Sequence, residues 1–324
     1  RTIYRVDPGT GGVLEVGGLT GRPAGVVWDW WVEGRAWCGT RGNGVFRSDD
    51  AGASWRPAGL KGRRVMTVVP SPAQEGLVWA GTEPSAVWRS DDGGETWRRL
   101  EGLESLPSRS EWSFPPRPET HHVRWIACHP SDPDRLWVAI EAGALISTVD
   151  GGHSWEDRVA GGPRDTHELA IHPGRPDTLR VAAGDGYFES RDGGLGWARP
   201  RDGLEVGYLR SVASDPGDPE TVVVSAASHA HAAYVAGRSD GRLYRREGEG
   251  PWRRVTAGWP DPPDTIAALL RPGAAHGEIW AADERGVHRS GDGGASWSRV
   301  AEYDRRPEHL RGLAVQTSAL RRGM

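Results

Sequence analysis

The chain has 324 residues, of which 40 are basic and 44 acidic, for a formal net charge of −4. This nearly balanced charge gives no support to nucleic-acid binding. No apolar run reaches the roughly 18 residues of a membrane span, so we expect a soluble, monomeric protein, either cytoplasmic or exported. The only two cysteines, Cys38 and Cys128, say little about the redox compartment.

An eight-residue phrase, Ser/Thr-x-Asp-x-Gly-x-Ser/Thr-Trp, recurs along the chain. Five copies are well preserved, one of them with Gly196 in the seventh position: residues 48–55, 90–97, 148–155, 190–197 and 290–297. Two worn copies at residues 5–12 and 245–252 complete the series. Successive copies start 42 to 58 residues apart. Such a period is typical of propellers, solenoids and arrays.

Each repeat reads as short apolar runs joined by turn residues. In one repeat, residues 65–70, 77–81 and 86–90 are expected strands, and the phrase forms the turn before a fourth. The same order recurs at residues 126–130, 136–140 and 145–148, at 169–173, 179–183 and 187–190, and at 212–216, 222–226 and 242–244. Four-stranded units at this spacing are propeller blades. Seven phrases therefore predict an all-β, seven-bladed β-propeller of antiparallel blades, forming one domain over residues 1–324.

The two ends of the chain are expected to share one blade. The first phrase starts at residue 5, too early for its blade's first two strands. We expect residues 2–6 and 13–16 to supply the outer strands and residues 311–316 the inner strand, which closes the ring and removes exposed sheet edges. Only residues 319–324 remain for that blade's second strand.

The phrases resemble the Asp-box of the BNR-repeat superfamily, which includes sialidases, sortilin-type receptors, xyloglucan-hydrolysing glycosidases and the photosystem II assembly factor. The resemblance covers nearly the whole chain. It implies that each box is the turn between the third and fourth strands of a blade, with Asp accepting hydrogen bonds, Gly taking an unusual conformation and Trp wedged against the blade. A calcium loop is the alternative, but one carboxylate per turn falls short of the ligands that calcium needs.

Functional residues are sought where the repeats differ. The first strands are aligned on Pro70, Pro130, Pro173, Pro216 and Pro272. Four residues earlier the position is apolar, occupied by Met66, Ile126, Leu169, Val212 and Ala268. Two residues before that, on the same face by strand alternation, stand Arg64, Arg124, His167, Arg210 and Ile266, with Arg311 in the closing blade. The next step of two gives Gly62, His122, Asp165, Tyr208, Asp264 and His309.

These strand ends surround the mouth of a propeller's central channel. We therefore expect the arginines and His167 to converge as a cationic ring, with His122, Asp165, Tyr208 and His309 above it. An anion would then be held by at least two of Arg124, Arg210 and Arg311. The alternative is that these groups form ion pairs with loop carboxylates such as Glu141, Asp185 and Asp283 and only solvate a funnel.

Two insertions point to the same mouth. The link of residues 101–121 carries Trp112 and Phe114, which either contribute to a binding site or pack as a lid. The insertion of residues 226–237 carries His229 and His231, which with His122, His167 and His309 could hold a transition metal, although no spacing fixes a site.

Three functions remain open. The first is binding of an anionic or polar ligand, such as an acidic glycan, a peptide or a small carboxylate, with no cofactor and no metal. The second is glycoside hydrolysis, sialidase-like or on another acidic glycan, with Asp165 paired to Glu168, Asp264 or Glu141; the Arg-Ile-Pro motif that opens sialidase domains is absent. The third is a metal-dependent hydrolase.

Overall fold

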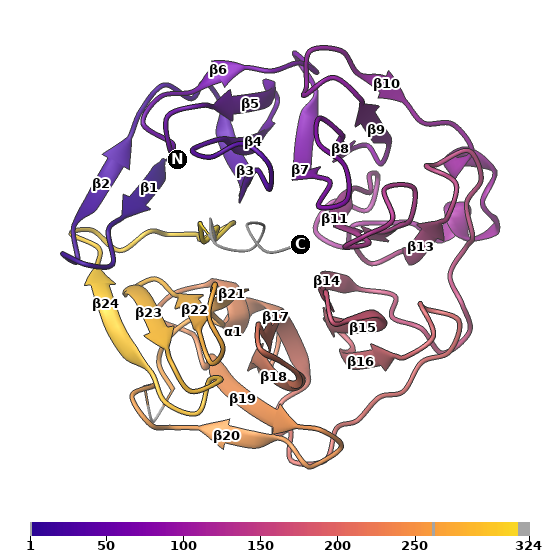
Figure 1. The fold of residues 1–324 in the computed structure, drawn as a ribbon. Coiled ribbons are helices and arrows are strands. Elements are labelled where there is room, and N and C mark those ends of the chain that lie inside the picture. The colour runs from indigo at the N-terminus through magenta and orange to yellow at the C-terminus, as the bar shows by residue number, and fades with distance from the viewer. Residues whose placement is uncertain (1, 261–262, 317–324) are drawn as a thin grey trace.

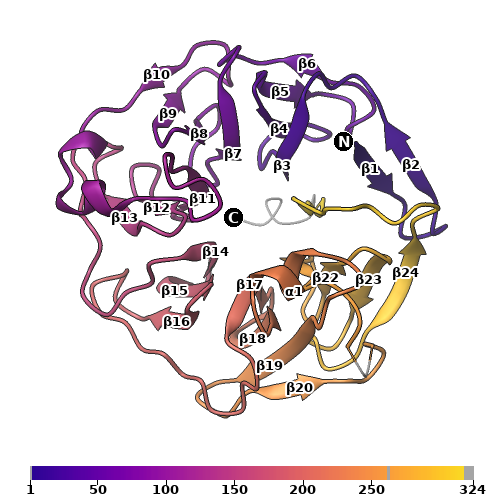
Figure 2. The ribbon, with the colours of Figure 1, turned by 180° about the vertical axis from the view of Figure 1, so that it is seen from behind.

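The computed structural model describes residues 2–260 and 263–316. Antiparallel sheets stand around a central axis in a propeller-like ring (Figures 1 and 2), so the fold is all-β, as predicted. No helix in the described ranges is long and apolar enough to cross a membrane.

The first complete repeats form two groups of four strands. The first group is β3 (Arg22–Trp28), β4 (Ala36–Arg41), β5 (Gly44–Ser48) and β6 (Arg56–Pro57). The second is β7 (Arg64–Pro70), β8 (Val78–Glu83), β9 (Val87–Ser90) and β10 (Arg98–Arg99). One pair of residues, Arg41 of β4 and Arg64 of β7, joins them into a single eight-stranded sheet. Two arginines are thus placed side by side at the start of an inner strand.

Two three-stranded sheets follow. They are β11 (Val123–Cys128), β12 (Leu136–Ile140) and β13 (Ala144–Thr148), then β14 (Thr166–His172), β15 (Arg175–Ala183) and β16 (Gly186–Ser190). In place of a fourth strand each has one isolated bridge, between Ser147 and Glu156 and between Glu189 and Ala198. The link before β11 carries two 3-10 turns, η1 (Leu103–Ser105) and η2 (Pro107–Glu111).

The next two sheets have four strands each. One contains β17 (Tyr208–Asp215), β18 (Asp218–Ala227), β19 (Arg242–Glu247) and β20 (Arg253–Val255), with the short helix α1 (Ala230–Tyr234) between β18 and β19. The other contains β21 (Leu269–Pro272), β22 (Ile279–Ala282), β23 (Gly286–Ser290) and β24 (Ser298–Glu302).

The two ends of the chain meet as expected, but not by strand pairing. Strands β1 (Ile3–Val6) and β2 (Val13–Val16) pair with each other, as predicted. The predicted inner strand at 311–316 does not form, because no residue from 304 to 316 takes part in a backbone–backbone hydrogen bond within the described chain. Instead Leu310, Leu313 and Val315 pack on an apolar cluster that contains Val6 and Val13. The second strand expected at 319–324 lies outside the described residues.

The Asp-box phrases at residues 48–55, 90–97, 245–252 and 290–297 are turns between third and fourth strands, as predicted. Those at 148–155 and 190–197 lead into isolated bridges instead of fourth strands. In the box of residues 90–97, Asp92 accepts hydrogen bonds from the Ser90 hydroxyl (2.8 Å) and the Thr96 amide (2.9 Å). The Thr96 and Ser90 donors lower the pKa of Asp92 to about 2. Gly94 has φ 86°, and a Cβ there would lie 2.7 Å from the Trp37 ring. Only glycine fits that position.

The box tryptophans fill the spaces between neighbouring sheets. Trp97 donates from Nε1 to the Ala58 carbonyl of the preceding repeat at 2.9 Å. Each box tryptophan belongs to, or packs on, a separate apolar cluster: Trp55, Trp97, Trp155, Trp197, Trp252 and Trp297. Local box chemistry and the packing of adjacent repeats are therefore linked through one residue.

Removal of a box hydroxyl tests whether the box stabilises the fold. The buried Ser90 hydroxyl donates to Asp92 and accepts from the Gly94 amide at 2.8 Å. Ser90→Ala leaves that amide unpaired, so we expect the free energy of unfolding to fall by about 1–3 kcal/mol in urea denaturation. Ser298→Ala is the control, because Ser298 is exposed and its hydrogen bond is long, 3.4 Å. Equal effects of the two changes would contradict a structural role for the box.

Candidate functional site

The inner strands carry a β-bulge close to the channel mouth. The register shifts near the start of each of β7, β11, β14 and β17, and the residues skipped there by the pairing are Met66, Arg124, His167 and Arg210. A bulge redirects a side chain relative to simple alternation. The bulge also corrects the alignment on prolines, because Pro70 lies inside β7, whereas β11, β14 and β17 end before their prolines. Arg64 therefore corresponds to His122 and not to Arg124.

Arg210 is buried, and other groups of the protein bind its guanidinium. Its guanidinium lies 4.6 Å from the centre of the Tyr234 ring. Nη1 donates to the Ala267 carbonyl at 2.6 Å and Nη2 to the Leu310 carbonyl at 2.5 Å. Burial lowers the pKa of Arg210 to about 10. We therefore leave Arg210 out of the binding site, because it joins α1, the β21 repeat and the C-terminal segment.

Glu141, one residue after β12, is the carboxylate that meets the cations. His122 Nε2 lies 2.6 Å and Arg124 Nε 3.8 Å from Glu141 Oε2. Burial would raise the pKa of Glu141, but the His122 hydrogen bond and the Arg124 charge hold it at about 2. This carboxylate stays ionised, as the ion-pair alternative expected.

His167 connects Glu141 to two more predicted residues. Its Nδ1 donates to the Leu209 carbonyl at 2.6 Å, while Nε2 lies 3.2 Å from the Tyr208 hydroxyl and 3.6 Å from Asp165 Oδ2. Burial would lower the pKa of His167, but the charge of Tyr234 and the contact with Asp165 raise it to about 9. These contacts favour the protonated imidazole.

Glu141, Asp165 and His167 also have the donor types of a metal site. One donor atom from each lies within 4.8 Å of the others. Two features oppose a metal ion there. His167 is already engaged by the Leu209 carbonyl and the Tyr208 hydroxyl, and Glu141 is already engaged by His122 and Arg124. The arrangement favours an imidazolium between two carboxylates.

The alignment on prolines missed two residues of this cluster. Arg41 ends β4 and pairs with Arg64. Burial lowers the pKa of Arg41 to about 10, and the charges of Arg311, Arg124 and Arg64 add to that effect. Arg41 stands five residues after the partner of its box serine, the position of Glu83, Glu141 and Glu284 in other repeats. Alignment on the boxes would have found it.

The other missed residue is Tyr234, the last residue of α1. Burial would raise its pKa, but the charges of His167, Arg124 and Arg210 lower it. The helix thus places a polarised hydroxyl within the field of three cations. No pattern in the sequence gave the position of this side chain.

The remaining predicted residues lie apart from the Glu141 cluster. Arg64 is half-exposed and lies 3.4 Å from Glu83, which also pairs with Arg117. Trp112 is buried in an apolar cluster, and its Nε1 donates to the Ser108 hydroxyl at 2.9 Å. His309 is exposed. Trp112 thus packs as core, while Phe114 lies edge-on to His122, with ring centres 4.9 Å apart.

The structure also shows where the other expected ion-pair partners and the two histidines of the insertion lie. Asp283 is buried and accepts from the Thr265 hydroxyl at 2.7 Å, so it serves the fold. Burial raises the pKa of Asp185. His229 caps α1 by accepting from the Ala232 amide at 3.2 Å, and its ring stacks on His231, with centres 6.5 Å apart. Both histidines are exposed.

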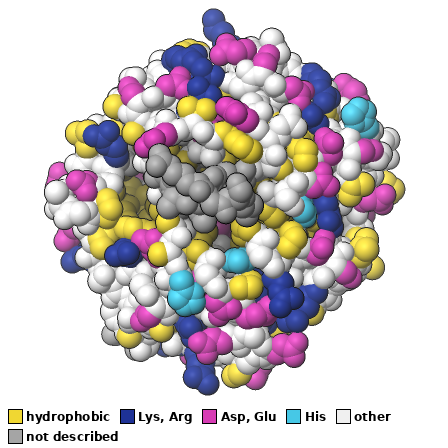
Figure 3. Space-filling view, in the orientation of Figure 1, with side chains coloured by type: hydrophobic (Ala, Val, Ile, Leu, Met, Phe, Trp, Pro, Cys, Tyr) yellow, Lys and Arg dark blue, Asp and Glu magenta, His cyan; other side chains and the backbone are white. Residues whose placement is uncertain are grey.

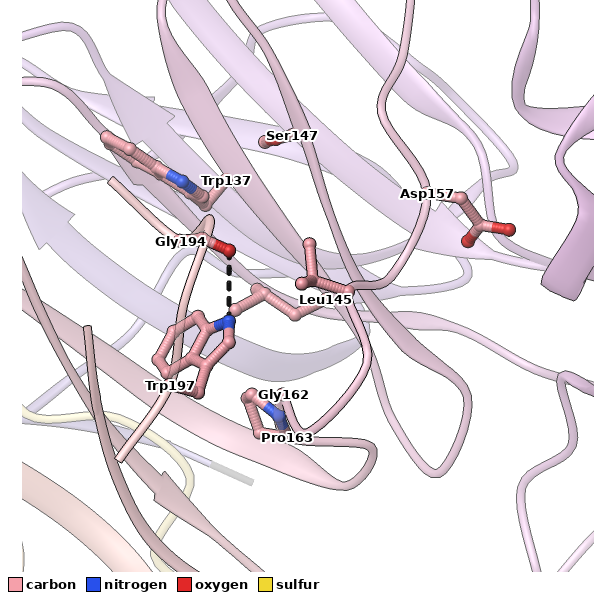
Figure 4. A pocket seen from close by; sticks show the side chains of 9 residues that line it. Trp137, Leu145, Ser147, Asp157, Gly162, Pro163, Gly194 and Trp197 are labelled. Carbon is pink, nitrogen blue, oxygen red and sulfur yellow. Dashed lines mark hydrogen bonds between the residues drawn. The ribbon is translucent and has the colours of Figure 1, made fainter. Parts of the chain in front are cut away.

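Two surface features away from the Glu141 cluster are shown in Figures 3 and 4. Basic and acidic side chains are interspersed around the face in Figure 3, with no field of a single sign. The hollow in Figure 4, between Trp137 and Trp197, has a volume of about 20 Å³. It has room for roughly one water molecule. The hydrogen bond there, from Trp197 Nε1 to the Gly194 carbonyl, is part of the box turn.

The His167 cluster predicts a pH dependence. A folded-state pKa of about 9 exceeds the ordinary value of 6.5, so the protonated imidazole stabilises the fold fully below pH 6.5. This contribution, on the order of 3 kcal/mol, should fade between pH 6.5 and 9. Urea denaturation across that range measures it, and NMR titration of the His167 ring identifies the group. An imidazole that titrates near 6.5 would contradict the cluster's electrostatics.

A family model matches the box region directly. The BNR/Asp-box repeat model matches residues 88–99, which span β9, the box turn and β10. The chain therefore carries a BNR/Asp-box repeat at these residues. The predicted resemblance is thereby confirmed. No curated protein sequence is significantly similar to this repeat protein.

Solved structures share the fold. An ancestral GH74 enzyme aligns with a TM-score of 0.68 and 17% identity, covering 94% of this chain and 40% of that enzyme. YCF48 from Cyanidioschyzon merolae aligns with a TM-score of 0.62 and 16% identity, covering 88% of each chain. A structure of YCF48 bound to D1 peptide aligns with a TM-score of 0.63 and 16% identity, covering 89% of this chain and 83% of that one. This BNR-repeat chain thus spans less than half of the GH74 enzyme and most of YCF48.

Proposed function

We propose that this BNR-repeat protein binds an anionic ligand at the mouth of its central channel through Arg41, Arg124 and Arg311. The supporting observation is the excess of cations there. The guanidinium groups of Arg41 and Arg311 have no hydrogen bond or ion pair with another described residue, and Glu141 is the carboxylate paired with Arg124. Cations partly removed from water are costly unless an anion compensates them.

The proposal includes the architecture that forms the mouth. The strand groups that begin at β1, β3, β7, β11, β14, β17 and β21 are taken as seven blades of one domain, with the first closed by the C-terminal segment. An acidic glycan, a peptide or a small carboxylate would each supply the anion. The YCF48 structure with a bound peptide is a precedent for a peptide ligand on this fold.

Citrate provides a direct test. Arg41→Gln removes one guanidinium without leaving a carboxylate unpaired, so folding should be preserved. Loss of a charge-assisted hydrogen bond of about 1.5–3 kcal/mol should weaken citrate binding about 10- to 150-fold in isothermal titration calorimetry. Arg201→Gln is the matched control, because Arg201 is exposed and stands in the link before β17. Equal affinity of wild type and Arg41→Gln, or no binding by wild type, would reject the proposal.

One observation favours glycoside hydrolysis as a second candidate. Oxygen atoms of Glu141 and Asp165 lie within 4.8 Å of each other, near the roughly 5–5.5 Å carboxyl separation of retaining enzymes. Glu168 is unsuitable because it is buried and accepts from Ser211 and Arg271. Glu141, held ionised, would be the nucleophile. Hydrolysis of an aryl uronide that Glu141→Gln and Asp165→Asn both abolish would support this candidate, and its absence in wild type would reject it.

A further inference from the structure

The segment of residues 304–316 is held differently from every strand of the ring. It runs from the end of β24 toward the centre (Figures 1 and 2). Its described residues make no backbone–backbone hydrogen bonds. The apolar side chains of Leu310, Leu313 and Val315 are only partly buried, and the bond from Arg210 to the Leu310 carbonyl attaches the backbone. Segments with few such contacts can open without unfolding of the rest of the protein.

The same segment carries a cation into the arginine cluster. Arg311 follows Leu310 directly, and Gly312 lies close to β3, where an added Cβ would be 3.1 Å from the Val26 amide nitrogen. Arg311 is exposed at the surface, but crowding by nearby protein atoms lowers its pKa, and the charges of Arg124 and Arg22 lower it further. Docking of the segment thus brings Arg311 toward like charges. Repulsion opposes the docked position when no anion is present.

We propose that an anion at the channel mouth docks this segment by bridging Arg311 to Arg41 and Arg124. The segment then acts as a strap, and ring closure and anion binding stabilise each other. The inference rests on the proposed function, because it uses the same anion. Coupling of this kind is reciprocal: whatever the anion adds to docking, docking adds to anion affinity.

Ala314→Cys gives a reporter of docking in the full chain. Ala314 is half-buried in the docked segment. The native thiols give little background, since burial raises the pKa of Cys38 and of Cys128 to about 12. A thiol reagent should label Cys at 314 only when the strap opens. If citrate binds only the docked form, labelling slows by a factor of 1 + [citrate]/Kd, about a hundredfold at a hundred times Kd.

Two further variants in the Ala314→Cys background sharpen the test. Arg311→Gln removes the bridge, so citrate should no longer slow labelling, and labelling without citrate should be slower than in the parent because the repulsion is gone. Arg201→Gln should behave as the parent. Citrate binding by calorimetry without any change in labelling would overturn the strap and leave the proposed function intact. No citrate binding at all would overturn both.

Discussion

Replacing Arg210 by Ala should lower the free energy of unfolding by about 3–5 kcal/mol. The side chain is among the largest fully buried ones, so its loss leaves a cavity beside Tyr234. It also leaves the Ala267 and Leu310 carbonyls without their guanidinium donor. Urea denaturation of wild type and variant, compared at equal m-value, measures the loss.

The matched control is Arg201→Ala, an exposed arginine that should change stability by less than about 0.5 kcal/mol. Citrate affinity separates the two possible roles of Arg210. If Arg210 serves the fold, its replacement should lower stability strongly, and any variant that still folds should bind citrate through the remaining arginines. A variant of normal stability that binds citrate at least tenfold more weakly would return Arg210 to the binding site.

The scaffold was predictable because its signals are local. Asp92 bonds to groups within four residues of it, so the phrase alone specifies the turn. The Trp97 contact crosses to the preceding repeat, and Trp155 and Trp252 make the same kind of contact. The regular spacing of the box tryptophans makes this packing visible in the sequence. Local chemistry repeated at a fixed period fixes the strand order of each repeat.

The candidate site was only partly predictable. Alternation of side chains drew attention to Arg124, His167 and Asp165, which the structure places near Glu141. A bulge in each inner strand then changed their direction and register, and an alignment on prolines cannot detect bulges. Tyr234 was missed because its place depends on how α1 docks on the ring, a tertiary contact without a sequence period.

The partners of Arg210 were also beyond the sequence. A cation in a buried inner strand suggested a binding ring, but the carbonyls of Ala267 and Leu310 belong to segments about 57 and 100 residues away. Whether a buried arginine serves a ligand or the fold depends on such distant acceptors. Charge and alternation show that a cation points inward, and the three-dimensional contacts decide what it binds.

Removal of the apolar side chains that close the ring should give the second large loss of stability. Changing Leu310, Leu313 and Val315 together to Ala should lower the free energy of unfolding by about 3–4 kcal/mol, roughly 1–1.5 kcal/mol for each partly buried side chain. The reason is that these side chains cover the cluster around Trp280 and Val287, while the segment has no strand pairing to hold it. Urea denaturation measures the change, and Leu195→Ala, at a leucine that is 76% exposed, is the control. A loss below about 1 kcal/mol would show that the segment does not close the ring, and the strap would then have no structural basis.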